Sequence, residues 1–149
     1  MGQSHLPALP CMCGNFRRAA RALTQLYDEA LRPLGLRSTQ FTILQTLSLT
    51  GEATQGQLGE LLAIDSTTLT RTLAILTRQG WISERPGEDR RERWLRLSAA
   101  GKTQFNQALP AWENIQSRLR RRLGESPWKS LAQLTQQLSN LLITEGNSL

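Results

Sequence analysis

The stretch from Thr54 to Ser98 constrains the fold more than any other part of this 149-residue chain. Thr54 and Gln57 form the T-x-x-Q pattern of a capping box, which predicts a short helix that begins at Thr54. Asp65 is a second candidate cap, and the helix that follows it would end at Gly80. An apolar strand, a charged turn and a second strand come next. Two helices joined by a tight turn and followed by a basic hairpin are the outline of a winged helix-turn-helix, which binds duplex DNA.

The second helix of this pair is the candidate recognition helix. Leu69, Leu73 and Leu76 have the spacing of a buried stripe. The residues left outside are Ser66, Thr67, Thr70, Arg71, Ala74 and Arg78. Small side chains let a helix enter the major groove closely, and hydroxyl groups bond phosphates or base edges. For any one Ser or Thr a solvated helix surface is an equal alternative, whereas Arg71 is favoured as a DNA contact.

The hairpin tip, from Arg85 to Arg93, carries charges of both signs. A solvated loop is one interpretation. On the other, an aspartate beside an arginine in a tight turn holds the guanidinium extended, and an extended arginine fits the narrow, negative minor groove. Asp89 would then orient its arginine neighbour.

The segments on either side of this unit have the periodicity of amphipathic helices. The winged unit can cover only part of their apolar stripes, so we expect the first helix and the last two to pack against a second chain. An intramolecular bundle is the alternative. The expected fold class is mainly α (α+β), with an irregular arm at 1–13, a helical dimerisation region at 14–36 and 99–149, and a winged helix-turn-helix at 37–98. In detail, we expect Ser38 and Ser126 to cap helices, and Leu58, Leu61 and Leu62 to face the core.

The charge balance is consistent with a nucleic-acid partner. The net charge is +6, and Lys102 and Lys129 are the only lysines among 18 basic residues. Arginine makes bidentate contacts with phosphates and bases, although anionic membranes and acidic proteins attract basic chains too. No apolar run approaches the roughly 20 residues of a membrane span, and the N-terminus lacks a signal-peptide pattern. We therefore expect a cytoplasmic protein with no membrane partner.

Catalysis is not expected from this sequence. The only histidine is His5, and no nucleophile triad or phosphate loop is recognisable. No cofactor is predicted. The remaining rival to a DNA-binding regulator is a winged helix that binds proteins and ignores DNA.

Several short motifs lie along the chain between about Gly14 and Leu142. They are Leu34-Gly-Leu36, Gln40-Phe41, Leu58, Leu61-Leu62, Thr70-Arg71, Leu76-x-x-x-Gly80-Trp81-Ile82, Asp89-Arg90-Arg91, Leu95-x-Leu97-Ser98 and Gly101. Together they resemble the MarR family, the multiple-antibiotic-resistance type regulators, whose signature is D-[RK]-R followed by L-[ST]-x-x-G. Each motif is weak alone, but the set is fairly specific.

The resemblance implies an obligate dimer that binds a pseudo-palindromic operator in double-stranded DNA, usually as a repressor. It also implies the order helix, helix, strand, helix, helix, strand, wing, strand, helix, helix. The family's recognition contacts map onto Ser66, Thr67, Thr68, Thr70 and Arg71. Its minor-groove arginine maps onto Arg91, with Asp89 as the orienting residue. Arg78, Arg90 and Arg93 complete the expected DNA-binding set.

The same resemblance implies that a phenolic acid or another small molecule controls binding from a pocket between the dimer helices and the winged unit. Candidate residues for that pocket are Arg17, Tyr27, Phe41 and Trp112. Ordinary core packing is the favoured alternative for the aromatic residues.

Cys11 and Cys13 end the N-terminal arm. Some family members sense peroxides or electrophiles through a cysteine near this position, and a thiol close to the arginines that follow would be reactive. The pair could form a disulfide across the dimer, or bind a soft metal such as Cu(I) together with His5 and Met12. Incidental cysteines are an equal alternative.

Overall fold

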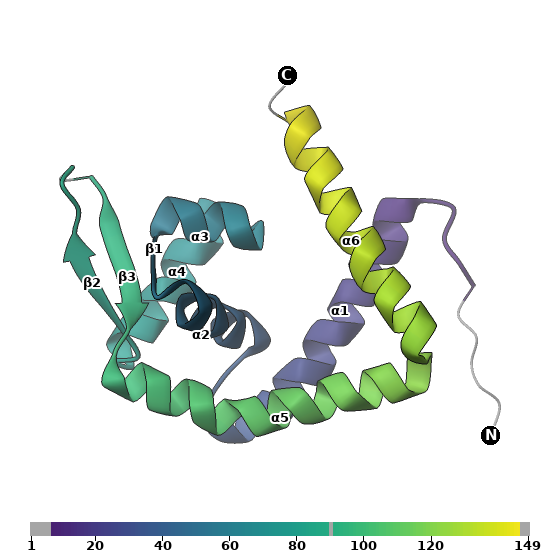
Figure 1. The fold of residues 1–149 in the computed structure, drawn as a ribbon, viewed down its shortest axis with the longest axis horizontal. Coiled ribbons are helices and arrows are strands. Elements are labelled where there is room, and N and C mark those ends of the chain that lie inside the picture. The colour runs from purple at the N-terminus through teal and green to yellow at the C-terminus, as the bar shows by residue number, and fades with distance from the viewer. Residues whose placement is uncertain (1–6, 90, 147–149) are drawn as a thin grey trace. The chain divides into compact units, whose positions relative to one another are not determined.

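The computed structural model describes residues 7–89 and 91–146, with side chains up to residue 141. The elements are α1 (Met12–Leu31), a 3-10 turn η1 (Arg32–Leu34), α2 (Ser38–Thr50), β1 (Glu52–Thr54), α3 (Gln55–Leu62), α4 (Ser66–Arg78), β2 (Ile82–Pro86), β3 (Arg93–Leu97), α5 (Ala99–Leu123) and α6 (Glu125–Gly146) (Figure 1). This mainly helical order, with a small sheet and a wing between β2 and β3, confirms the predicted fold class. The packing of the terminal helices on a second chain stays a prediction.

The three strands form an antiparallel sheet in the order β1-β3-β2. Ala53, Ile82, Leu95 and Leu97 are buried on one face of this sheet. The same buried cluster contains Phe41, Leu44 and Leu47 of α2, Leu58 of α3, and Leu69, Leu73 and Leu76 of α4. The period-two alternation of β3 and the leucine stripe of α4 were therefore both predicted correctly.

Two predicted helix starts are confirmed. The backbone N–H of Gln57 donates to Thr54 Oγ1 over 3.2 Å, and the N–H of Thr54 donates to Gln57 Oε1 over 2.8 Å. This closes the capping box of α3. The N–H of Thr68 donates to Asp65 Oδ1 over 2.9 Å, which caps α4.

Two other predicted caps are wrong. Ser38 is the first residue of α2 rather than its cap, and its N–H donates to Asp28 Oδ1 over 2.7 Å. A carboxylate from α1 thus satisfies the N-terminus of α2, a contact that local sequence cannot reveal. Ser126 lies inside α6, which begins at Glu125 directly after Gly124 at φ 89°.

One predicted core position is also wrong. Leu58 is fully buried and Leu62 packs against the core, but Leu61 is 62% exposed. In a helix of eight residues the buried stripe is narrow, and the i+4 neighbour of Leu58 occupies it in place of the i+3 neighbour.

The chain divides into two compact units, Met1–Trp112 and Glu113–Leu149. In the second unit Arg120 and Glu125 form a bidentate ion pair that joins the end of α5 to the start of α6. Among the described residues, no helix combines the length and apolar character that a membrane crossing requires.

The start of α5 lies very close to the entrance of the wing. Ser98 Oγ accepts the N–H of Gly101 over 2.9 Å and donates to the Gly80 carbonyl over 2.5 Å. A Cβ added to Gly101 would overlap the carbonyl oxygen of Trp81 and lie 2.7 Å from its carbonyl carbon. Only glycine permits this approach of two backbones.

Gly101→Ala should therefore lower the free energy of unfolding by about 1–3 kcal/mol or more, because the overlap is with backbone that cannot turn aside. Chemical denaturation followed by circular dichroism measures the change. Gly56→Ala is the control, since the nearest atom to its Cβ is 3.9 Å away. That variant should be neutral, or more stable by up to about 1 kcal/mol. Equal losses in both variants would contradict the close-approach argument.

Candidate nucleic-acid interface

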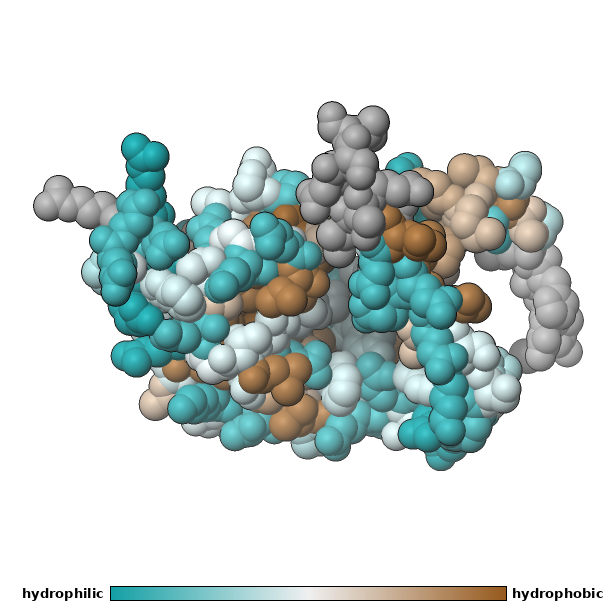
Figure 2. All heavy atoms as spheres, turned by 45° about the horizontal axis from the view of Figure 1, so that its top comes forward, coloured by the Kyte–Doolittle hydropathy of each residue, from teal (hydrophilic) through white to brown (hydrophobic). Residues whose placement is uncertain are grey.

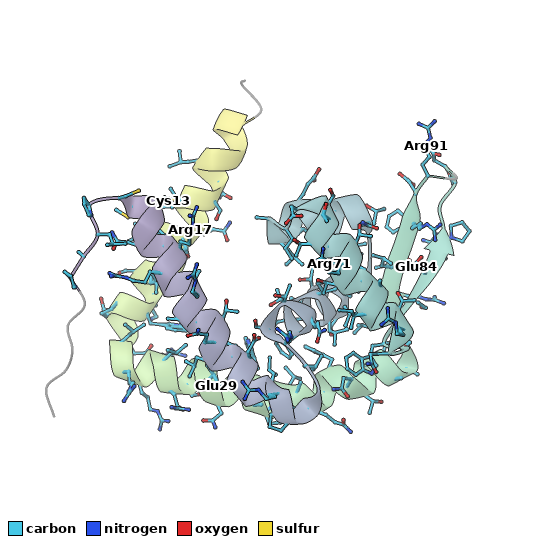
Figure 3. The ribbon with its side chains drawn as sticks, turned by 180° about the vertical axis from the view of Figure 1, so that it is seen from behind. Cys13, Arg17, Glu29, Arg71, Glu84 and Arg91 are labelled. Atoms are coloured by element: carbon cyan, nitrogen blue, oxygen red, sulfur yellow. The ribbon has the colours of Figure 1, made fainter. Side chains whose placement is uncertain are left out.

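The outer face of α4 is polar and open to solvent. Ser66, Thr67, Thr68, Thr70, Arg71 and Arg78 are all exposed. Ser66, Thr67, Thr70, Arg71 and Ala74 line one shallow hollow of the surface. The structure therefore brings most of the predicted recognition residues together on one helix face, and Figure 3 shows Arg71 on the outer side of that helix.

A contact between the two helices of the motif was not predicted. Gln55 Nε2 at the start of α3 donates to Thr70 Oγ1 over 2.8 Å. The Thr70 hydroxyl then keeps its own proton, which is free to be donated to an acceptor outside the helix. Gln55 thus orients a candidate DNA-contacting hydroxyl. Its proximity to α4 follows from the crossing of the two helices, and no local pattern indicates it.

The N-terminus of α4 has a carboxylate as its cap. Hydrogen bonds from Thr68 lower the pKa of Asp65 below its ordinary value, because they stabilise the charged form. A phosphate group also binds well at a helix N-terminus. Asp65 therefore fixes the first turn of α4, and its charge opposes an anion bound at that same end.

The Arg91 side chain at the wing tip is exposed to solvent. Asp89 Oδ1 accepts the backbone N–H of Arg91 over 2.9 Å, so the aspartate shapes the turn through the main chain rather than through the guanidinium. Figure 3 shows the Arg91 side chain pointing away from the hairpin. Arg90 lies outside the described residues. Arg93 is exposed but donates to Glu84 Oε2 over 3.1 Å.

The root of the wing contains a cluster that was not predicted. Arg85 on β2 bonds both carboxylate oxygens of Glu52 on β1, and its guanidinium carbon lies 5.1 Å from the Trp94 ring centroid. The bond to Arg85 lowers the pKa of Glu52, and burial opposes this to a smaller extent. In Figure 2 the wing, at the left of the view, is largely hydrophilic. Its surface is therefore suited to a polar partner.

Of the four predicted effector residues, the structure brings Phe41 and Trp112 into contact. Phe41 is 2% exposed, and its ring centroid lies 5.5 Å from that of Phe105 and 6.0 Å from that of Trp112. This is the packing of a core. Tyr27 is half-buried, and burial raises its pKa. Within residues 7–89 and 91–146, the Arg17 side chain donates a hydrogen bond to Cys13, over 3.8 Å from Nη2 to Sγ.

Cys11 and Cys13 are exposed free thiols at the start of α1. The described residues contain no group of three or more His, Cys, Asp or Glu that could hold a metal ion, and His5 lies outside them. The structure thus places a guanidinium beside one of two accessible thiols.

Comparisons with known proteins agree with the winged helix-turn-helix fold. The model of the MarR family matches residues 36–92. The HTH-type transcriptional regulator YwoH of Bacillus subtilis (strain 168) is 32% identical over 90 residues, which are 60% of this chain and 66% of that protein. That alignment leaves about a third of YwoH unmatched.

Solved structures match over more of the chain. The transcriptional regulator MosR of M. tuberculosis, in complex with DNA, is 34% identical with a TM-score of 0.81, covering 90% of this chain and 97% of MosR. A mutant MarR from E. coli, complexed with operator DNA, shares the fold at 22% identity and a TM-score of 0.77, covering 85% of this chain and 92% of that one.

The α4 cap generates a pH prediction. The pKa of Asp65 is lower in the folded state than in the unfolded state. The Asp65 cap therefore stabilises the fold fully at a pH above its unfolded-state pKa, and this stabilisation is lost as the pH falls through its folded-state pKa. Asn is as good a cap as Asp but does not titrate. Unfolding titrations between about pH 5 and pH 2 should show a shallower acid loss of stability in Asp65→Asn than in the wild type.

Glu60→Gln removes one exposed carboxylate from α3 and serves as the control. It should keep the wild-type acid dependence. If both variants flatten the curve equally, the loss reflects net charge and not the cap.

Proposed function

The chain belongs to the MarR family of winged helix-turn-helix transcriptional regulators, and from this premise we propose that it is a dimeric repressor released from its operator by a small molecule or by thiol oxidation. The family relationship establishes a DNA-binding transcription regulator. The DNA-contact roles are supported by two observations: α4 has an open polar face, and the exposed Arg91 at the tip of the wing forms no ion pair within the part of the chain that the structure describes.

The proposed contacts divide between the two grooves. Ser66, Thr67, Thr68, Thr70 and Arg71 on α4 enter the major groove, where hydroxyl groups bond phosphates and base edges. Arg91 enters the minor groove, and Asp89 holds its backbone turn. Arg78 and Arg93 lie nearer the phosphates, although Arg93 must first leave Glu84. Arg90 belongs to the same proposed set.

Dimerisation is supported by apolar side chains that remain in solvent. On α6, Leu131, Leu134, Leu138 and Leu141 are 36–60% exposed. On α1, Phe16 and Leu23 are 38% and 40% exposed. Figure 2 also shows hydrophobic side chains open to solvent between hydrophilic ones. We infer that regions 14–36 and 99–149 pack against a second chain. Two recognition helices would then read half-sites about 34–36 Å apart.

The thiol switch is the proposed mode of release that the structure supports best. Oxidation of Cys11 and Cys13 by hydrogen peroxide would break two S–H bonds and join the two sulfurs, and the two electrons and two protons given up by the thiols would reduce the peroxide to two waters. Both thiols are accessible, and Arg17 orients the Cys13 sulfur through its hydrogen bond. Binding of a soft metal by the same thiols is the alternative.

A small-molecule effector is the second mode of release. The proposed site lies near Arg17, Tyr27 and Trp112, with Phe41 as part of its wall, and its ligand is a phenolic acid or a similar small molecule. Because Phe41 is buried, such a ligand would have to displace core packing.

One selection experiment tests the proposed function. Duplexes bound by the full chain are selected from a random pool, and the winners are examined for two related half-sites. Release is then measured after adding peroxide, Cu(I) or a phenolic acid. Selection of no sequence above background would favour a winged helix that binds proteins instead.

Arg91→Ala should weaken binding to the selected duplex by about 1–3 kcal/mol, because a minor-groove contact is lost. It should also reduce the slope of log affinity against log salt by about 1. Fluorescence anisotropy across a salt series measures both quantities. Arg121→Ala removes an exposed arginine from α5 and is the matched control. Similar losses in the two variants would mean that only net charge matters.

Cys11→Ser and Cys13→Ser should each keep DNA binding after peroxide treatment that releases the wild type, since each variant lacks one partner of the proposed Cys11–Cys13 bond. Anisotropy follows release, and intact mass under non-reducing conditions follows disulfide formation. Reductant should restore wild-type binding. Release of all three proteins alike would rule out this thiol pair as the switch.

A further inference from the structure

We propose that Glu52 and Arg85 are positioning residues for the wing, because their ion pair crosses β3 and ties the hairpin to the helix-turn-helix. This inference rests on the proposed role of the wing in contacting DNA. Neither residue needs to touch DNA for the effect.

The strand register shows why this pair is unusual. β1 and β2 do not pair with each other, because β1 pairs with one edge of β3 and β2 pairs with the other. Glu52 is opposite Arg96, whereas Arg85 is opposite Trp94. Neighbouring strands lie about 4.8 Å apart, so Arg85 must reach across a whole intervening strand.

The pair has strong geometry despite its exposure. Arg85 Nη2 lies 2.6 Å from Glu52 Oε1, and Arg85 Nε lies 3.1 Å from Glu52 Oε2. A bidentate contact fixes direction as well as distance. The Trp94 ring supports the guanidinium from β3 at 5.1 Å. One side chain thus joins all three strands.

The two ends of the pair belong to different parts of the interface. Arg85 is on the hairpin that ends in Arg91. Glu52 is on β1, whose last residue, Thr54, is also the cap of α3. The next residue, Gln55, bonds Thr70 on the recognition helix. The pair therefore closes a short path from the wing to α4, and it fixes the spacing between the minor-groove arginine and the major-groove helix.

A second ion pair on the same wing provides the matched control. Arg93 and Glu84 join β3 to β2, which the backbone ladder already connects. Loss of Glu84 changes net charge by the same amount as loss of Glu52, but leaves the link between β1 and β2 intact.

A change in net charge alone and a positioning role predict different DNA binding for Glu52→Ala. Glu52→Ala raises the net charge by one, and by simple electrostatics this should tighten binding to any duplex. Positioning predicts that affinity for the selected duplex, relative to a random duplex, falls by about three- to tenfold, the size expected for coupled contacting groups. The ratio should be unchanged in Glu84→Ala, because the Arg93 that it frees would contact phosphates, which are the same in both duplexes. The double variant Glu52→Arg with Arg85→Glu should recover at least part of the ratio, which a nonspecific structural defect would not allow.

A measurement without DNA tests the Glu52–Arg85 brace separately from the proposed contact between the wing and DNA. Amide hydrogen exchange of the full-length variants should be faster in the wing of Glu52→Ala than in that of Glu84→Ala or the wild type, with thermal stability nearly unchanged because exposed pairs stabilise folding little. Unchanged wing exchange in Glu52→Ala, or equal loss of the binding ratio in both single variants, would overturn the inference. If the wing loosens while Arg91→Ala binds like the wild type, the proposed DNA contact by the wing fails and the Glu52–Arg85 brace stands.

Discussion

The approach of Gly101 to the backbone of Trp81 is the constraint on which the winged unit depends. At this point the end of α4, both roots of the wing and the start of α5 meet within a few residues. The Ser98 hydroxyl links the Gly80 carbonyl to the Gly101 amide, and the N–H of Ser98 donates to the Trp81 carbonyl over 3.0 Å. A larger residue at position 101 would separate these backbones. The base of the wing would then no longer be held in a fixed position relative to α5, even if the contacts at its tip remained.

From this junction the fold is assembled by contacts of increasing sequence range. Local caps at Thr54 and Asp65 begin the two helices of the motif. The leucine stripe of α4 and the apolar face of the sheet then bury one another. Polar bonds between elements set the final spacings, as Gln55 does for Thr70 and Glu52 does for Arg85. Each such bond contributes modestly to stability, but each has a defined direction, and direction is what groove recognition requires.

Sequence reasoning succeeded where the physical cause is local. The capping box, the Asp65 cap, the α4 stripe and the β3 alternation all follow from neighbours within four residues. It failed where the partner is distant: Asp28 on Ser38, and Glu52 on Arg85, join positions 10 and 33 residues apart. Leu61 was misplaced because a short helix buries a narrower stripe than the count of leucines suggests. The exposed α4 face was predicted, but the bond that orients Thr70 was not. Asp89 was expected to hold a guanidinium, and its recorded bond is to the main chain of Arg91.

Among the described arginines of the wing, Arg85 and Arg93 are each paired with a glutamate, and Arg91 is not. Paired cations have already given up much of their attraction for phosphate, so on binding they displace few counterions from DNA. Arg85 and Arg93 would then contribute little to the sequence-independent affinity with which a regulator slides along DNA. The nonspecific affinity from these two paired residues would be small. Arg91 would add affinity mainly where the minor groove is narrow enough to accept a single extended side chain.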